Sequence, residues 1–80
     1  MGLRDYKTEL QEVTQRLFRA TPVYTLIEES GPDHDKQFVS EIVIDGRPCG
    51  RGVGRSKKMA EQAAAMEALA ALTRTDPGSR

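Results

Sequence analysis

The stretch from Gly50 to Ala65 constrains the fold more than any other, because it places a glycine-bearing strand directly before an alanine-rich helix. Ser56 is a suitable N-cap, since its hydroxyl can accept a hydrogen bond from a free N–H of the first turn. Lys57 and Lys58 follow, although the positive end of a helix dipole ordinarily favours acidic residues. Positive side chains, free N–H groups and the dipole together suit a phosphate. The stretch therefore predicts a helix whose first turn binds an anion; the alternative is an ordinary solvated basic turn.

The basic residues of the chain are concentrated beside this helix start. Residues 47–58 hold five basic side chains and no acidic one, whereas the rest of the chain holds 7 basic and 12 acidic side chains, a net charge of −5. The chain as a whole has no net charge, which argues against a general binder of polyanions. A basic edge on an acidic body indicates an anionic partner that docks in one orientation.

Length and composition fit one small domain. A chain of 80 residues builds only a modest core and buries about 60–65% of its unfolded surface. Cys49 is the single cysteine, which excludes an internal disulfide and a cysteine-based zinc site and favours a reducing compartment, the cytoplasm. No apolar run is long enough to span a membrane, and no signal peptide is visible. We expect the domain at residues 5–72, a linker or expression remnant at 1–4, and a flexible C-terminal tail at 73–80.

The N-terminal segment predicts a helix from Asp5 to about Arg19, with Asp5 as its cap. Its apolar residues recur at spacings of four, three and four, which places them on one stripe. They are Tyr6, Leu10, Val13 and Leu17. The opposite face carries Thr8, Gln11, Glu12 and Gln15. Such a row suits hydrogen bonds to hydroxyls and base edges better than contacts with phosphates, although a solvated helix face explains it equally well.

Three strands are expected next, at Tyr24–Ser30, Phe38–Ile44 and about Pro48–Gly54. Gly31-Pro32-Asp33 indicates a turn after the first strand. His34 follows in a polar loop, and no second histidine or cysteine lies near it, so metal binding is not expected. Asp45-Gly46 predicts a tight type I′ hairpin between the second and third strands.

The glycines at positions 50, 52 and 54 have two possible roles. They could hold a ligand phosphate, or they could let a helix pack closely on the sheet. They lack the Walker and dinucleotide spacings, so nucleotide binding is not expected. The second helix is expected from about Lys57 to Leu72, where alanines at three- and four-residue spacing permit close packing. The predicted fold is α+β, helix–strand–strand–strand–helix, with both helices on one face of a three-stranded antiparallel sheet.

This order of elements, with three groups of residues, resembles the double-stranded RNA-binding domain over nearly the whole chain. The first helix has the run Thr-x-x-Gln-Glu at Thr8, Gln11 and Glu12, and the loop has Gly31-Pro32-x-His34, followed by Phe38. The third group is Gly52, Gly54, Ser56, Lys57, Lys58, Ala60, Glu61, Ala63 and Ala64. All three groups in this order and spacing are highly specific. The opening from Asp5 to Glu12 is similar to the start of this domain in bacterial ribonuclease III.

The resemblance implies a binding mechanism. A domain of this type spans ~16 base pairs of A-form RNA and contacts two minor grooves and the phosphates between them. By resemblance, Thr8, Gln11, Glu12 and Gln15 enter one minor groove, Pro32 and His34 enter the next, and Arg55, Ser56, Lys57 and Lys58 bind the phosphates. Within this implied mechanism, Glu12 suits only a groove, because a carboxylate repels phosphate but can accept a hydrogen bond from a 2′-hydroxyl.

The resemblance also implies what this chain does not do. Ribonuclease III cleaves RNA with a separate domain whose Glu and Asp residues bind magnesium, and no such signature occurs here. The chain is therefore expected to be non-catalytic and to need no cofactor. Its parent is expected to be a cytoplasmic, magnesium-dependent, homodimeric endoribonuclease of RNA processing, including rRNA processing. The expected partner is double-stranded RNA, without a membrane or small-molecule ligand, and the isolated domain is expected to be monomeric.

Two other classes of function fit the sequence less well. A protein–protein interaction or dimerisation module of the same fold is the alternative, but such a version is expected to lack the basic helix start and the loop histidine. Both are present here. A free-standing enzyme has little support, because the sequence has no paired-carboxylate pocket, no cysteine–histidine pairing and no metal cluster.

Overall fold

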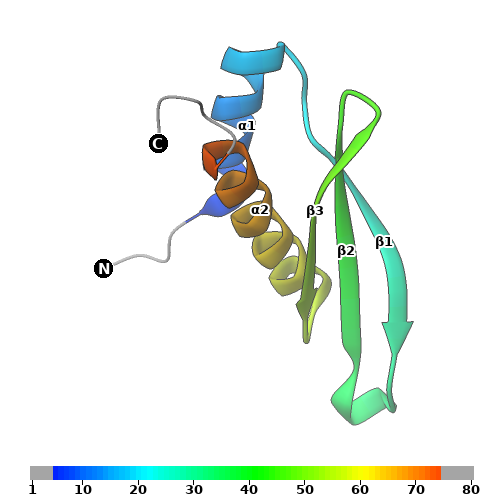
Figure 1. The fold of residues 1–80 in the computed structure, drawn as a ribbon. Helices are drawn as coiled ribbons and strands as arrows, with labels where there is room; N and C mark the ends of the chain where they lie inside the picture. The colour runs from blue at the N-terminus through cyan, green and yellow to red at the C-terminus, as the bar shows by residue number, and fades with distance from the viewer. Residues whose placement is uncertain (1–4, 75–80) are drawn as a thin grey trace.

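The computed structural model describes residues 5–74, which form two helices and a three-stranded antiparallel sheet. The elements in order are α1 (Tyr6–Phe18), β1 (Val23–Ser30), the short 3-10 helix η1 (Asp33–Asp35), β2 (Gln37–Ile44), β3 (Arg47–Gly54) and α2 (Lys57–Arg74). The strands lie in the order β1-β2-β3, and both helices lie on the same side of the sheet (Figure 1). This confirms the predicted α+β fold.

The helix α1 begins and ends at residues suited to those positions. Asp5 is the N-cap, and its carboxylate accepts a hydrogen bond from the Thr8 backbone N–H. Arg19, at the C-cap, adopts the left-handed conformation with a φ of 55°. Its N–H donates to the Gln15 carbonyl, and the Ala20 N–H donates to the Thr14 carbonyl. These contacts satisfy groups that a helix end otherwise leaves without partners.

The apolar stripe predicted for α1 is wrong at its C-terminal end. Leu10 is fully buried, but Leu17 is 56% exposed and Thr14 is fully buried instead. Figure 1 shows the reason, since the last turn of α1 stands beyond the end of α2, where no helix or strand of residues 5–74 covers it. The Thr14 hydroxyl donates to the Gln11 carbonyl, which removes the cost of burying an unpaired hydroxyl.

The hairpin between β2 and β3 is confirmed as a type I′ turn. Asp45 and Gly46 have φ values of 53° and 81°, and this turn type requires positive φ at both central residues. The β1–β2 pairing is regular except for an irregularity between Leu26 and Glu28. Each strand begins one residue earlier than the sequence predicted, at Val23, Gln37 and Arg47.

The contact between α2 and β3 decides between the two roles of the strand glycines. A Cβ atom at Gly52 would lie 2.5 Å from the Ala60 carbonyl oxygen and closer still to the Ala64 nitrogen. One at Gly54 would lie 2.5 Å from the Ala60 nitrogen, and one at Gly50 would lie 2.7 Å from the Ala64 oxygen. Because these glycines have no side chain, the backbone of α2 packs directly against the backbone of β3. Beside this contact lies the core, which comprises Leu10, Ile42, Ile44, Ala64, Ala65 and Ala68.

The helix α2 extends two residues beyond its predicted end. It begins at Lys57, as expected, and continues to Arg74. The tail was expected from residue 73, and its remainder, 75–80, lies outside the described residues, as do residues 1–4. Within residues 5–74, no helix combines the length and apolar character needed to cross a membrane.

Candidate nucleic-acid interface

The polar row of α1 is exposed as the sequence predicts. Thr8, Gln11, Glu12 and Gln15 all lie on the surface. The side chains of Gln11 and Glu12 make no hydrogen bond or ion pair with any residue that the structure describes, so both are available to a ligand. Gln15 is partly engaged, because its Nε2 donates to the Thr21 hydroxyl at 2.8 Å.

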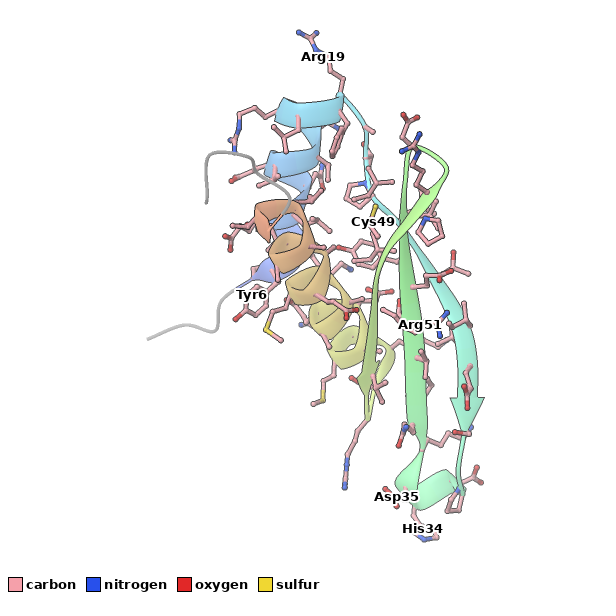
Figure 2. All side chains as sticks on the ribbon, in the orientation of Figure 1. Tyr6, Arg19, His34, Asp35, Cys49 and Arg51 are labelled. Carbon is pink, nitrogen blue, oxygen red and sulfur yellow. The ribbon has the colours of Figure 1, made fainter. Side chains whose placement is uncertain are left out.

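The loop between β1 and β2 presents His34 to solvent. Gly31 adopts a φ of +94° to turn the chain, and η1 follows it. The Pro32 carbonyl accepts a hydrogen bond of 2.9 Å from the Asp35 N–H, which leaves one lone pair of that oxygen for another donor. Figure 2 shows His34 and Asp35 at the end of the molecule opposite Arg19.

The start of α2 is basic. The Ser56 hydroxyl accepts a hydrogen bond of 3.1 Å from the Met59 N–H, which confirms the predicted N-cap. The first turn has no acidic residue. Lys57 and Lys58 are exposed, and neither makes a hydrogen bond or ion pair within residues 5–74. Two unpaired cations at the positive end of a helix form a site suited to an anion.

Two observations connect this helix start to the β1–β2 loop. An Arg55 guanidinium nitrogen lies 3.9 Å from an Asp35 carboxylate oxygen. The pKa of Glu29, at the end of β1, is lowered by a hydrogen bond from Lys36, by the charge of Lys36 and further by the charge of Lys57.

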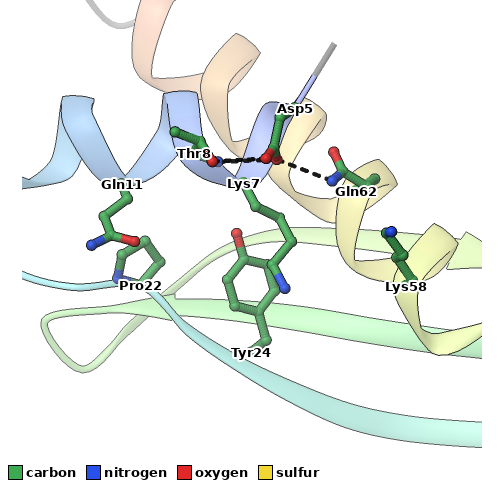
Figure 3. A pocket seen from close by; sticks show the side chains of 8 residues that line it. All are labelled: Asp5, Lys7, Thr8, Gln11, Pro22, Tyr24, Lys58 and Gln62. Atoms are coloured by element: carbon green, nitrogen blue, oxygen red, sulfur yellow. Dashed lines mark hydrogen bonds between the residues drawn. The ribbon is translucent and has the colours of Figure 1, made fainter. Parts of the chain in front are cut away.

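On its other side, the helix start reaches α1 through a shared hollow. Lys58, Thr8 and Gln11 line this hollow of about 370 Å³, and Figure 3 shows them around it. The start of α2 thus lies between the polar row of α1 and the loop that carries His34 (Figure 1). The structure brings Lys58 together with Thr8 and Gln11, and Arg55 together with the loop; Gln15 does not line the hollow.

The hollow also contains residues that sequence reasoning did not select. Lys7 lies with its Nζ 4.7 Å from the centre of the Tyr24 ring and 2.5 Å from a Glu61 carboxylate oxygen. The Tyr24 hydroxyl oxygen is buried and has no hydrogen-bond partner within residues 5–74. Desolvation, followed by the charges of Glu61 and Asp5, raises the pKa of Tyr24 to about 12. No local pattern marks these residues, because they meet only in the folded chain.

Asp5 and Gln62 form the upper wall of the hollow (Figure 3). The sequence identified Asp5 as a helix cap but gave no signal for Gln62. The Gln62 Nε2 donates to Asp5 Oδ1 at 3.1 Å, and the Tyr6 N–H donates to Gln62 Oε1 at 2.9 Å. These two bonds join the start of α1 to α2.

The arrangement offers hydrogen-bonding groups and positive charge over an open surface. Across residues 5–74, no group of three or more His, Cys, Asp or Glu side chains is placed to hold a metal ion. The geometry suits a ligand that presents hydroxyls or base edges to α1 and an anionic backbone to α2.

Comparison with known proteins shows which sequences this chain is similar to. The family model described as "Double-stranded RNA binding motif" matches residues 6–72. The chain is 54% identical over 66 residues to Ribonuclease 3 of Syntrophobacter fumaroxidans, which covers 82% of this chain and 27% of that protein. It is 55% identical over 69 residues to Ribonuclease 3 of Caldanaerobacter subterraneus, which covers 86% of this chain and 30% of that protein. The chain thus spans less than a third of these relatives.

Solved structures show the same fold. The structure of Arabidopsis HYL1, described in connection with miRNA processing, matches with a TM-score of 0.74 and 36% identity, over 88% of this chain and 99% of that one. Dicer from Pichia stipitis matches with a TM-score of 0.68 and 32% identity, over 82% of this chain and 32% of that one.

Proposed function

The chain belongs to the family of double-stranded RNA-binding motifs, and we propose that it binds duplex RNA by A-form shape, largely independently of sequence, as the substrate-binding domain of a ribonuclease III-like endoribonuclease. The observation that carries the proposal is the pair Lys57 and Lys58. They are exposed, and unpaired within residues 5–74, at a helix start that lies between the polar row of α1 and the histidine loop.

Each part of this surface has a proposed role. The polar row, Thr8, Gln11, Glu12 and Gln15, enters one minor groove, where A-form RNA displays its 2′-hydroxyls. His34 and the Pro32 carbonyl enter the next minor groove. Lys57 and Lys58, with Arg55 and Ser56, bind the phosphates of the major groove between them. A domain of this type spans ~16 base pairs.

The proposal extends to the parent protein through its relatives. Because the chain spans 27% and 30% of two bacterial Ribonuclease 3 proteins, we propose a longer parent that is a cytoplasmic, homodimeric endoribonuclease active in RNA processing, including rRNA processing. Magnesium would belong to its nuclease domain, and the RNA-binding domain would be monomeric and non-catalytic by itself.

A comparison of three nucleic acids tests the binding proposal. We expect this domain to shift an RNA duplex in a gel at concentrations that leave a DNA duplex of the same sequence and single-stranded RNA unbound. The physical reason is that B-form DNA differs in groove shape and lacks the 2′-hydroxyl. All three probes are measured at one salt concentration, because the phosphate contribution depends on salt. Equal affinity for the RNA and DNA duplexes would contradict the proposal.

Glu12 gives a second test, because charge and hydrogen bonding predict opposite signs. Replacing Glu12 with alanine removes a negative charge, so a purely electrostatic binder should bind RNA more tightly. If the Glu12 carboxylate accepts from a 2′-hydroxyl, the substitution should instead weaken binding by about 1 kcal/mol, the net value of one hydrogen bond. The measurement is the dissociation constant at matched salt for an RNA duplex and for one with 2′-deoxy residues in one minor groove.

Glu28→Ala is the matched control, since it removes the same charge from an exposed position on β1. It should leave RNA affinity unchanged or slightly increased. Tighter RNA binding by Glu12→Ala would contradict the proposal that α1 enters the minor groove. If Glu12→Ala weakens binding to the deoxy duplex as much as to the RNA duplex, the 2′-hydroxyl is not the partner of Glu12.

A further inference from the structure

The carboxylate of Asp5 takes three hydrogen bonds at the edge of the proposed interface. Its Oδ1 accepts from the Thr8 N–H at 3.2 Å and from Gln62 Nε2 at 3.1 Å. Its Oδ2 accepts from the Thr8 hydroxyl at 2.8 Å. Figure 3 shows Asp5 between Thr8 and Gln62.

These contacts fix the direction of the Thr8 hydroxyl hydrogen. An ionised carboxylate has only acceptors, and a threonine hydroxyl has one hydrogen and two lone pairs. The hydrogen-bond distance between Thr8 and Asp5 therefore requires that Thr8 donate its single hydrogen to Asp5. Hydrogen bonds from the Thr8 side chain, the Gln62 side chain and the Thr8 backbone lower the pKa of Asp5 to about 2, so this carboxyl is ionised at neutral pH.

Gln62 holds the carboxylate in this orientation. Its Oε1 accepts from the Tyr6 N–H, so its amide cannot turn over without placing two donors against each other. Its Nε2 must then point at Asp5 Oδ1. Since Gln62 belongs to α2, the second helix determines which oxygen of Asp5 remains for the Thr8 hydroxyl.

We propose that Asp5 is a positioning residue for RNA recognition, which makes the exposed Thr8 hydroxyl an obligate acceptor and so selects ligands that present a hydrogen-bond donor at this point. This inference rests on the proposed function. In a minor groove, A·U pairs present only acceptors on their base edges, whereas the ribose 2′-hydroxyl is both donor and acceptor. An acceptor-only Thr8 thus pairs with the 2′-hydroxyl and not with those edges.

Asp5→Asn releases the Thr8 hydroxyl from its acceptor-only state with little change in shape. The asparagine Oδ1 can still accept from the Thr8 N–H and from Gln62, while its Nδ2 replaces Oδ2 and donates to the Thr8 hydroxyl. The Thr8 hydroxyl then presents one hydrogen and one lone pair, so it can donate as well as accept. The opposite orientation of the asparagine amide is unfavourable, because its Nδ2 would meet two donors.

The test compares two A-form duplexes of A·U pairs, which lack the guanine amine. One has 2′-hydroxyls and the other has 2′-fluoro groups, which accept weakly and cannot donate. For the unmodified domain we expect the hydroxyl duplex to bind more tightly. Asp5→Asn should reduce the ratio of the two affinities, by up to about fivefold, the value of one hydrogen bond, because Thr8 can then donate to the fluoro group. The ratio is the readout because the lost charge of Asp5 strengthens binding to both duplexes alike.

Thr8→Val supplies the control, since valine has the shape of threonine without its hydroxyl. In the Thr8→Val background, Asp5→Asn should leave the ratio unchanged. An unchanged ratio for Asp5→Asn alone would overturn the inference, and so would an equal effect in both backgrounds, because Asp5 would then act without Thr8. Failure of the unmodified domain to bind the hydroxyl duplex would instead overturn the proposed function.

Discussion

Alanine at position 52 is expected to destabilise the domain by more than ~3 kcal/mol, above the usual range for an overpacked core. An added methyl group at Gly52 meets the Ala60 oxygen and the Ala64 nitrogen. Both atoms belong to the backbone of α2, so no side chain can rotate to make room and the whole helix must move. A small domain has only ~5–15 kcal/mol of total stability, so the loss is a large share of it. The measurement is the free energy of unfolding in urea.

Gly46→Ala is the matched control for this prediction. Gly46 has a φ of +81° and no atom within 4 Å of an added Cβ. Its substitution therefore imposes backbone strain without crowding and should cost only about 1–2 kcal/mol. Gly52 has no positive φ, so crowding alone is tested there. If the two variants lose equal stability, close packing is not the reason for the glycine at position 52.

Replacing both Lys57 and Lys58 with alanine is expected to weaken RNA binding by at least about a hundredfold. Each lysine is proposed to make a hydrogen bond to a phosphate, and bonds to charged groups contribute ~1.5–3 kcal/mol each. The same change should preserve the fold and can raise its stability, because each cation at the positive end of the helix dipole costs ~0.3–1 kcal/mol. Binding and stability should thus move in opposite directions.

Affinity measured across a range of salt concentrations checks this prediction. The slope of log affinity against log salt should become shallower by roughly 0.7–0.9 for each phosphate that the variant no longer neutralises. Arg19→Gln combined with Arg47→Gln removes the same charge from residues with no role in the proposed binding surface and should change affinity far less; Arg19 lies at the end of the molecule opposite His34. If the two double variants behave alike, only the net charge matters and the helix start has no special role.

Local features of the fold were predictable because their causes lie within a few residues of each other. Asp45-Gly46 specifies a turn with two positive φ values, and Ser56 caps the helix that follows it. The four polar residues assigned to α1 are exposed for the same reason, since the spacing of a single helix fixes its faces.

Features that depend on contacts between distant segments were not predictable in this way. Thr14 is buried and Leu17 is exposed because of where α2 ends beside α1. The pairing of Asp5 with Gln62 joins residues 57 positions apart. The sequence alone allowed two roles for the glycines of β3, and only the position of the α2 backbone beside them shows that they permit close packing. The roles of the interface residues themselves stay predictions until RNA binding is measured.

The contact between the glycines of β3 and the alanines of α2 also bears on how the domain discriminates between duplexes. A helix that rests on a strand through main-chain atoms cannot be repositioned by a change of side-chain rotamer, in the way a helix on long flexible side chains can. The lysines at its start are therefore presented at a nearly fixed height above the sheet. Binding a duplex of matching width then requires little ordering of the protein. If these lysines bind phosphates as proposed, a duplex of another width, such as B-form DNA, must deform to reach them, and the energy of that deformation falls on the nucleic acid.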